Sequence, residues 1–401
     1  MKILLLNLYF PPDTSATAKM AAAIVETLAT KHHVTVLCGR PSYDPAERRS
    51  WRLWRREAHG AARILRVGST DYSRVSMKLR VLNYLTYVAL AVPLSLFVQC
   101  DVVLAMTDPP FEGIVGAFVA LLKRRLYVYN IQDMYPDMAV GGSLVRPGIL
   151  SRLWERMHRW ALRRADRLIV LGNDMRSRIL AKGIPASGIR IVRSGADIPS
   201  ANAAQLVLDE EVVRQIRGNA KFLLLHAGNI GFYGAWESLI TAVRDLASDG
   251  IELVFIGEGA QRGYVQTLAS DAKNVRFLPF FPSSQISSVL AAADVHVITV
   301  KRGLEGVVVP SKMYGILAAG KPILAVAAEE CDACSLGTQF GFALSADPDK
   351  PESIAAAIRA LATDGKRLKS MADSARAAAP QFGRVKELQK FVAIVEEAAN
   401  A

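Results

Sequence analysis

The sequence predicts an α/β protein made of two similar halves, each with a parallel sheet covered by helices. Short apolar runs alternate along the chain with amphipathic stretches of helix length, which is the pattern of β-α-β units. The alternation fades over residues 194–211, which are polar and contain proline, and then starts again. The 401 residues are enough for two domains, and with 51% hydrophobic residues each can bury a core.

The apolar runs give the expected strands of each half in chain order. In the first half they are residues 2–7, 33–38, 62–67, 101–106, 126–131, 167–172 and 189–193. In the second half they are residues 221–229, 252–259, 274–280, 294–300 and 321–327. Each half is therefore expected to be Rossmann-like. Ligands bind at the carboxyl ends of such strands, so we expect a central cleft between the halves.

The break in the pattern sets the expected domains. We place an N-terminal domain at residues 1–200 and a C-terminal domain at residues 201–380. The chain is expected to end in two or three helices, over residues 351–363, 366–379 and 384–398. The last segment, residues 381–401, is a candidate to pack back on the N-terminal domain.

Positive charge is concentrated in the first half of the chain. Residues 1–200 hold 29 lysines and arginines against 15 acidic residues, and residues 201–401 hold 20 against 22. Much of the excess lies in residues 48–66 and 152–167, which mix arginine with tryptophan. That mixture suits an anionic membrane surface or nucleic acid, and it is also compatible with a plain solvated face.

Residues 81–98 are uncharged and apolar over a length that could cross a bilayer. Pro93 and polar residues such as Asn83 and Thr86 interrupt the run. We therefore expect a helix that is buried or inserted in a surface, rather than one that spans. The apolar start of the chain, residues 3–10, is too short for a secretory signal and is expected to be a buried strand.

The four cysteines are too few for a disulfide framework in a chain of this length. Cys331 and Cys334 have the spacing of a redox pair or of half a zinc site, but no second such pair accompanies them. We expect reduced, cytosolic thiols and no metal site.

Two loops of the first half carry candidate site residues. Thr14, Ser15 and Thr17 open a helix whose N–H groups could receive a phosphate, although helix caps use the same residue types. Asp133 directly follows a strand, and Asp137 comes four residues later. A carboxylate at a strand end can act as a base or hold a hydroxyl group, and an Asx turn explains it equally well.

Glycines dominate the first loop of the second half. Gly228, Gly231 and Gly234 are spaced three apart, which lets a ligand approach the backbone, but they do not form a dinucleotide fingerprint. Further on, Glu258 could hold ribose hydroxyls and the turn at Phe281 could seat a base. Ordinary strand–turn–helix junctions account for both as well.

Residues 303–322 combine one carboxylate, Glu305, with a helix that starts at Pro310 and Ser311. Lys312, in the first turn, adds a point charge to the partial positive charge of the helix N-terminus. Together they suit a diphosphate. Glu305 is too short and too distant to bind the same phosphates, and fits hydroxyls of a group attached to them.

With these motifs, the chain resembles the retaining glycosyltransferases of family four, which have the GT-B fold. It is most similar to the bacterial branch that builds surface polysaccharides, typified by N-acetyl-fucosamine transferases. The resemblance covers nearly the whole chain. The matching segments are residues 9–18, 130–137, 226–234, 253–259, 280–281, 293–298 and 303–322.

The resemblance implies that the C-terminal domain binds a UDP-linked sugar donor. The residues it assigns to the donor are Gly228, Asn229, Gly231, Glu258, Phe281, Arg302, Ser311 and Lys312. It implies that Asp133, Glu305 and Lys312 are the catalytic residues. The reaction would need no metal and no cofactor besides the nucleotide sugar.

The resemblance also implies a lipid-linked or saccharide acceptor on the N-terminal domain, near Thr14, Ser15 and Thr17. The basic first half would then hold the enzyme on the inner face of the cell membrane, with no nucleic acid as partner. Two other functions remain open. One is a nucleotide-sugar epimerase with the same fold, and the other is a basic protein that binds membranes or nucleic acid without catalysis.

The chain departs from the family pattern at three places. The family has two glutamates separated by seven residues, and the second falls at Gly315 here. The loop over residues 228–236 lacks the usual arginine and lysine, a role that Arg302 could take or Lys312 could fill alone. The loop after the first strand has Thr14–Thr17 in place of a glycine pair. These departures put individual contacts in doubt.

Overall fold

The computed structural model describes residues 1–41, 53–72, 76–197 and 208–400. The chain divides into two compact units. Unit 1 is Met1–Val192 with Glu387–Ala401, and unit 2 is Arg193–Lys386. The predicted boundary between residues 200 and 201 lies outside the described residues, as does the start of the basic segment 48–66.

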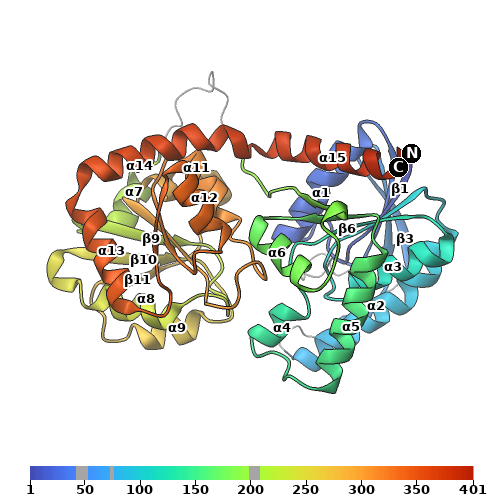
Figure 1. Ribbon diagram of the computed structural model, residues 1–401, viewed down its shortest axis with the longest axis horizontal. Helices are drawn as coiled ribbons and strands as arrows, with labels where there is room; N and C mark the ends of the chain where they lie inside the picture. Colours follow the sequence, from blue (N-terminus) through green and yellow to red (C-terminus); the bar gives the residue numbers. More distant parts are fainter. Residues whose placement is uncertain (42–52, 73–75, 198–207, 401) are drawn as a thin grey trace. The chain divides into compact units, whose positions relative to one another are not determined.

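Unit 1 contains, in its described residues, an eight-stranded sheet in the order β3-β4-β2-β1-β5-β6-β7-β8 (Figure 1). Neighbouring strands are parallel except β3 and β4, which are antiparallel. The strands are β1 (Lys2–Leu6), β2 (His33–Cys38), β3 (Trp54–His59), β4 (Ala62–Val67), β5 (Val102–Ala105), β6 (Leu126–Asn130), β7 (Arg167–Val170) and β8 (Ile189–Ile191).

Helices cover both faces of this sheet. They are α1 (Ala16–Ala29), α2 (Met77–Phe97), α3 (Glu112–Lys123), α4 (Asp137–Gly141), α5 (Ile149–Arg164), α6 (Asn173–Ala181) and α15 (Arg384–Asn400). α1 and α15 share an apolar cluster with Leu104 and Val128. α3 packs on the opposite face, where a Cβ on Gly116 would lie 2.5 Å from that of Ala105, so only glycine allows this close approach. The last helix therefore completes the core of unit 1.

α2 corresponds to the apolar segment at residues 81–98. Its inner side, which includes Tyr84, Tyr87 and Ala91, packs on unit 1, but only 22% of its most apolar stretch is buried. By length and composition alone, α2 is the helix in the described part of the chain that could cross a membrane. Most of this helix is exposed, so the first of the two expected environments, burial in the protein, is wrong, and insertion in a surface stays a prediction.

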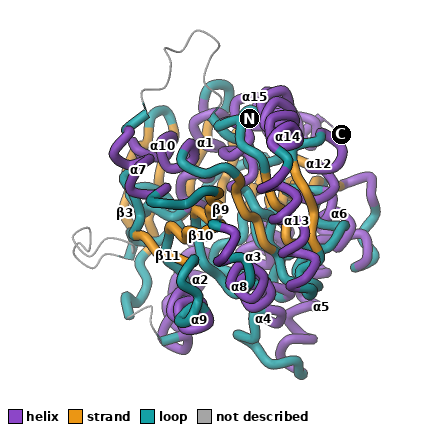
Figure 2. Tube along the Cα trace, turned by 90° about the vertical axis from the view of Figure 1, so that its left-hand side faces the viewer, coloured by secondary structure: helices purple, strands orange, loops and turns teal. Residues whose placement is uncertain are grey.

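Unit 2 is built, over its described residues, on a six-stranded parallel sheet in the order β11-β10-β9-β12-β13-β14. α8 and α9 lie on one face of β9–β11, and α7 and α10 lie on the other (Figure 2). The strands are β9 (Phe222–Ala227), β10 (Ile251–Ile256), β11 (Val275–Leu278), β12 (Val295–Thr299), β13 (Ile323–Val326) and β14 (Ala343–Ala346). The helices are α7 (Glu210–Arg217), α8 (Trp236–Arg244), α9 (Arg262–Leu268), α10 (Ile286–Ala291), α11 (Lys312–Ala318), α12 (Asp332–Phe340), α13 (Pro351–Thr363) and α14 (Gly365–Ala378).

Two strands, β3 and β14, were not predicted from the sequence. β3 carries mostly charged side chains and pairs with β4 across a turn at Gly60, whose φ is +55°. It lies at the edge of its sheet, where charged residues prevent pairing with other chains. β14 is a short edge strand of small residues. Neither has the apolar run that marked the other strands.

The cysteine pair lies at the start of α12. Cys331 and Cys334 are both buried free thiols, and Sγ of Cys334 lies 3.6 Å from the carbonyl oxygen of Ala327. Burial raises the pKa of Cys334. In the described residues, no cluster of three or more histidine, cysteine or acidic side chains is arranged to hold a metal ion.

Candidate active site

Lys312, the first residue of α11, places its ammonium group at the carboxyl end of β9. Its Nζ lies 3.0 Å from Nε2 of His226, a fully buried residue of that strand. Burial lowers the pKa of Lys312 to about 7. Burial, together with this ammonium, holds the pKa of His226 well below its usual range. A cation beside a neutral imidazole lacks a counter-charge, so Lys312 is placed to receive an anion.

Two glycine-rich loops pack against each other next to this lysine: the β9 loop (residues 228–235) and the β10 loop (residues 257–261). Gly228 has φ +135°, and a Cβ there would lie 3.6 Å from the lysine Nζ. Gly257 has φ +147°, and its Cβ would lie 2.0 Å from the carbonyl oxygen of Gly228. A Cβ on Gly259 would lie 2.3 Å from a carbonyl oxygen of the β9 loop. Only glycines allow this packing.

Aromatic side chains fix the path of the β9 loop. The indole N–H of Trp236 donates to the carbonyl oxygen of Gly231 at 2.8 Å, and the hydroxyl of Tyr233 donates to that of Asn229 at 2.8 Å. A Cβ on Gly231 would lie 2.5 Å from the Tyr233 ring. Asn229 itself is exposed. These bonds fix the backbone of the loop, with Asn229 at the surface of unit 2 and Gly231 buried.

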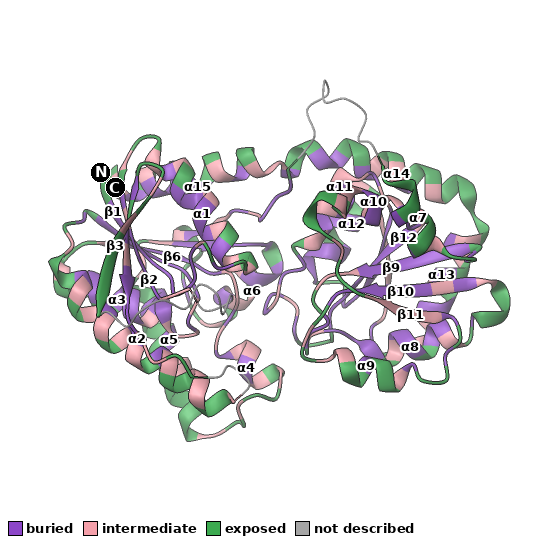
Figure 3. Ribbon diagram, turned by 180° about the vertical axis from the view of Figure 1, so that it is seen from behind, coloured by how far each residue is buried: buried purple, intermediate pink, exposed green. Residues whose placement is uncertain are grey.

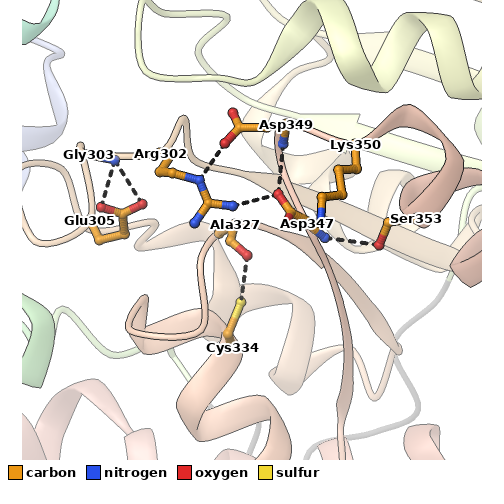
Figure 4. Close-up of polar contacts among 9 residues, drawn as sticks. All are labelled: Arg302, Gly303, Glu305, Ala327, Cys334, Asp347, Asp349, Lys350 and Ser353. Carbon is orange, nitrogen blue, oxygen red and sulfur yellow. Dashed lines mark hydrogen bonds and ion pairs between the residues drawn. The ribbon is translucent and has the colours of Figure 1, made fainter.

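The Glu305 loop (residues 301–311) is anchored to the β9 loop. The N–H of Lys301 donates to the carbonyl oxygen of Tyr233 at 2.6 Å. The N–H of Gly303 donates to both carboxylate oxygens of Glu305, at 2.9 and 3.1 Å (Figure 4). This capped turn holds Glu305, which is half-buried, in a fixed position.

Arg302 is held by two acidic residues further along the chain. Its Nη2 donates to Asp347 at 2.6 Å, and its Nε donates to Asp349 (Figure 4). These bonds raise the pKa of Arg302 above its usual value. A phosphate would have to compete with both carboxylates for this guanidinium, so its role at a diphosphate stays a prediction.

The other residues predicted to bind the donor also follow the carboxyl ends of strands in unit 2. Ser311 is exposed just before α11, and its hydroxyl does not cap the helix in the described structure. Glu258, half exposed, accepts from Nη1 of Arg262 at 2.6 Å. Phe281 packs on an apolar cluster beside Leu278. Their roles toward ribose, base and phosphate are not tested by these contacts.

Gly315, where the family pattern has a second glutamate, lies on α11 one turn after Lys312. A Cβ at this position would have Leu290 as its near neighbour, at the ordinary contact distance of 3.9 Å. Gly315 is also partly exposed. The absence of a carboxylate at this place is therefore a feature of the sequence that the packing does not impose.

Asp133 lies in unit 1, in the loop after β6. Burial, and then the carboxylate of Asp108 after β5, raise the pKa of Asp133 to about 7. Asp137, the other carboxylate of this segment, accepts from Nζ of Lys182 at 2.8 Å. Asp133 can therefore gain or lose a proton near neutral pH, whereas Asp137 is engaged in a salt bridge with Lys182.

The predicted acceptor residues open α1. Oγ of Ser15 accepts from the N–H of Ala18 at 3.1 Å, which makes Ser15 the N-cap of the helix. Thr14 is exposed and Thr17 is half-buried in the first turn. Ser15 thus has a structural role, and binding of an acceptor by these three residues stays a prediction.

A polar pocket of unit 1 was not predicted. It is lined by Leu8, Tyr9, Arg40, Ser69, Thr70, Asp71, Arg80, Asn83 and Tyr84. Nε of Arg80 donates to the hydroxyl of Tyr84 at 2.7 Å, and the hydroxyl of Thr70 donates to Oδ1 of Asn83 at 2.9 Å. The polar side chains within the apolar stretch 81–98 are the sequence signal that could have indicated this pocket.

Comparison with known families matches each unit separately. Residues 15–195 match the family described as glycosyl transferase 4-like domain. Residues 221–364 match the family described as glycosyl transferases group 1. The two matches fall within units 1 and 2, apart from the last few residues of the first.

Curated relatives are named as glycosyltransferases. One, WcaI of Escherichia coli K12, is named as a colanic acid biosynthesis glycosyl transferase and is 25% identical over 379 residues, 90% of this chain and 91% of WcaI. Another, WbjE of Pseudomonas aeruginosa, is named as a glycosyltransferase and is 26% identical over 264 residues, 64% of each chain.

A similar solved structure is that of HepE from Anabaena in complex with UDP-glucose. The TM-score is 0.71 with 18% sequence identity, and the match covers 100% of both chains. At 18% identity, the similarity to HepE is evidence for the fold alone. The prediction of two Rossmann-like α/β domains of the GT-B type is confirmed.

Proposed function

We propose that this chain transfers a sugar from a nucleotide-sugar donor to an acceptor in bacterial surface-polysaccharide synthesis, because residues 15–195 and 221–364 match two families of glycosyl transferases. The names of its relatives and the UDP-glucose bound by HepE support this proposal. We propose UDP as the nucleotide.

The observation that carries the proposal is the buried ammonium of Lys312 beside the β9 loop. A nucleoside diphosphate that leaves during sugar transfer accumulates negative charge. A preorganised cation at that position stabilises the charge where it develops, with little reorganisation. Backbone N–H groups of the β9 loop would add to this, and Glu305 would contact the donor sugar.

The proposed reaction retains the configuration at the sugar carbon and needs no metal cofactor. The acceptor would attack on the face from which the diphosphate leaves, and a phosphate oxygen would accept its proton. Two checks follow. An NMR spectrum of the product should show the donor's anomeric configuration, and EDTA should leave the rate unchanged. An inverted product or an EDTA-sensitive rate contradicts these parts.

We propose a lipid-linked acceptor and a place at the inner face of the cell membrane. The excess of lysine and arginine in residues 1–200 supports attraction to anionic headgroups.

The experiment is a screen of UDP-sugars for UDP release, with bacterial lipid extract as acceptor. Lys312→Ala should lower kcat/KM by about 10²- to 10³-fold, the usual effect of removing one group that stabilises a developing anion. Lys273→Ala, at an exposed lysine of unit 2, is the matched control and should retain activity. Activity of Lys312→Ala within a few-fold of wild type would refute the assigned role.

The alternative of an epimerase predicts a new sugar isomer from donor alone. An epimerase needs acid and base groups around the sugar, and Asp137 is already paired with Lys182. Incubation with the donor in the absence of acceptor, followed by chromatography of the sugar, separates the two functions.

A further inference from the structure

Three neighbouring helices of unit 1 have exposed apolar side chains on their outer sides. α3 lies between α2 and α5 and contacts both, and all three cover one face of the sheet (Figure 3). His158 of α5 and Gly113 of α3 both pack on Tyr129 of β6, which places these helices on the same side. We call the outer side of these helices the α2–α3–α5 face.

The outer side of α2 is apolar along most of its length. Its exposed large side chains are Met77, Val81, Leu82, Leu85, Leu96 and Phe97, and Phe97 is 86% exposed. From residue 81 to residue 97 this helix contains no charged residue. Water-facing sides of helices are normally polar, so an apolar side of this length indicates a surface that another phase or molecule covers.

α3 continues the apolar surface at its C-terminal end. Leu121 and Leu122 are exposed there, and Leu122 lines a groove together with Leu96 and Phe97 of α2. Basic residues border the same groove. Nζ of Lys123 donates to the carbonyl oxygen of Leu96 at 3.0 Å, and Arg125 lines the groove beside it.

α5 divides its surface into three stripes. One is buried in unit 1 and includes His158 and Leu162. The second is apolar and exposed, with Ile149, Leu150, Leu153, Met157 and Trp160. The third is basic, with Arg152, Arg156, Arg159 and Arg163. A helix with adjacent apolar and arginine stripes, and tryptophan among the apolar residues, is typical of one that lies in a membrane interface.

We propose that the α2–α3–α5 face is a docking surface for a bilayer that contains anionic phospholipid. Apolar side chains of the face would enter the boundary between headgroups and acyl chains, and the arginine stripe of α5 would contact phosphates. This deepens the proposed function, on which it rests for the lipid-linked acceptor, by naming the surface that meets the lipid.

The packing of α2 indicates that it lies on the membrane and does not cross it. The hydroxyl of Tyr87 donates to the buried carboxyl group of Glu112 in α3 at 3.1 Å, and Ser95 is fully buried. A spanning helix would have to break these contacts. Other occupants fit less well, because nucleic acid leaves the apolar stripes exposed and a second copy of the chain brings its own arginines.

The first test is co-sedimentation of the full-length protein with vesicles at low salt. Wild type should pellet with vesicles of phosphatidylglycerol and phosphatidylcholine, and should remain soluble with phosphatidylcholine alone. Binding should weaken as salt is raised, since the arginine contacts are screened. A wild-type protein that stays in the supernatant with the anionic vesicles overturns the proposal.

Paired variants locate the surface. Phe97→Ser with Ile149→Ser removes two of its most exposed apolar groups, and we expect at least a tenfold loss of vesicle affinity. Ile286→Ser, at an exposed isoleucine of unit 2, is the matched control and should bind as wild type does. Arg152→Gln with Arg156→Gln should give a similar loss. Wild-type affinity in both double variants would contradict the proposed face.

Three further measurements separate a loss of membrane docking from other causes of a negative result. Hydrogen exchange of the wild type should show protection in α2, α3 and α5 when anionic vesicles are added, without any need for a variant. Light scattering should show a monomer; a dimer that the Phe97 variant dissociates would assign the face to a second copy instead. Retained UDP binding by the variants distinguishes failure of docking from failure of the proposed function.

Discussion

Lys312 is the residue on which the candidate donor site depends. Its ammonium lies against the neutral imidazole of His226, with the pKa lowered to about 7 by burial. Such a group is costly to the folded state and becomes favourable when an anion binds beside it. A buried cation of this kind is typical of a functional site, where stability is lost in exchange for ligand affinity.

Lys312→Met should raise stability and lower kcat/KM as strongly as Lys312→Ala does. In the wild type the unfolded chain binds more protons than the folded one between pH 7 and pH 10.5, so the free energy of unfolding rises with pH across that window. The free energy of unfolding of the variant should not rise with pH in this way, and at pH 7 it should exceed that of the wild type by roughly 1–3 kcal/mol. Thermal melts from pH 6 to pH 10 measure both. A variant less stable than wild type at pH 7 would contradict the assigned burial cost.

Activity should depend on pH through two groups of the free enzyme. Asp133 has a pKa of about 7. Its ionised carboxylate would accept a hydrogen bond from the acceptor's hydroxyl group, so kcat/KM should fall below pH 7 as Asp133 becomes protonated. Lys312 should be protonated to bind the diphosphate, so kcat/KM should fall above it. We expect a bell-shaped profile centred near pH 7. In Asp133→Asn the acid limb should disappear; an unchanged acid limb would assign it to another group.

Local sequence identified the residue types of the site but not their partners. The run from Glu305 to Lys312 was recognised from its helix start, its charge and its resemblance to a family. The contact of Lys312 with His226 joins residues 86 positions apart, and Arg302 meets Asp347 across 45 positions. Such pairs form only when strands from distant parts of the chain become neighbours, and the spacing of residues along one sequence carries no record of them.

At the scale of elements, the β9 and β10 loops are joined by backbone hydrogen bonds into one loop pair. Gly228 donates its N–H to the carbonyl oxygen of Ile256 at 2.8 Å, and Ile230 donates to that of Glu258 at 2.9 Å. The two loops extend the pairing of β9 and β10 beyond the strands themselves. The Glu305 loop is attached to this loop pair through a hydrogen bond to the carbonyl oxygen of Tyr233. A change in one loop is therefore expected to move the others.

Gly257→Ala should disrupt the packing of the β9 loop against the β10 loop. The added Cβ would meet the carbonyl oxygen of Gly228 at 2.0 Å, and φ of +147° is unfavourable for alanine. We expect a loss of about 1–3 kcal/mol in stability and at least a tenfold loss in UDP affinity. Gly263→Ala, in α9 with open space around the new Cβ, should instead be neutral or stabilise by about 0.5–1 kcal/mol. Calorimetric titration of UDP and thermal unfolding of both variants measure these two quantities. Equal UDP affinity and equal stability of the two variants would contradict the prediction.

Most elements could be predicted because a buried parallel strand is a continuous apolar run. β9 and β10 show this pattern plainly, with all but one residue buried in each. β3 does not, because an antiparallel edge strand faces solvent and carries arginine and glutamate. The apolar composition of α2 left burial and insertion in a surface both open, and the structure shows that most of this helix is exposed.

At the scale of the whole molecule, the chain returns to its first unit at its end. Phe391, Val392 and Val395 of α15 join the apolar cluster formed by β1, β2, β5 and α1. Ion pairs of Glu397 with Arg167 and Arg190 fix the end of this helix. Unit 1 is therefore complete only after unit 2 has been synthesised. The unit that carries the positive charge is also the one that carries the α2–α3–α5 face.

Calorimetric titration of UDP into the full-length protein, at pH 8 in two buffers of different ionisation enthalpy, tests most directly whether the Lys312 site binds a nucleotide-sugar donor. We predict one site and the uptake of up to one proton per UDP, because the bound anion raises the pKa of Lys312 from about 7. Lys312→Met should lose the proton uptake and most of the affinity. No binding of UDP, or binding of wild-type strength by this variant, would contradict the account.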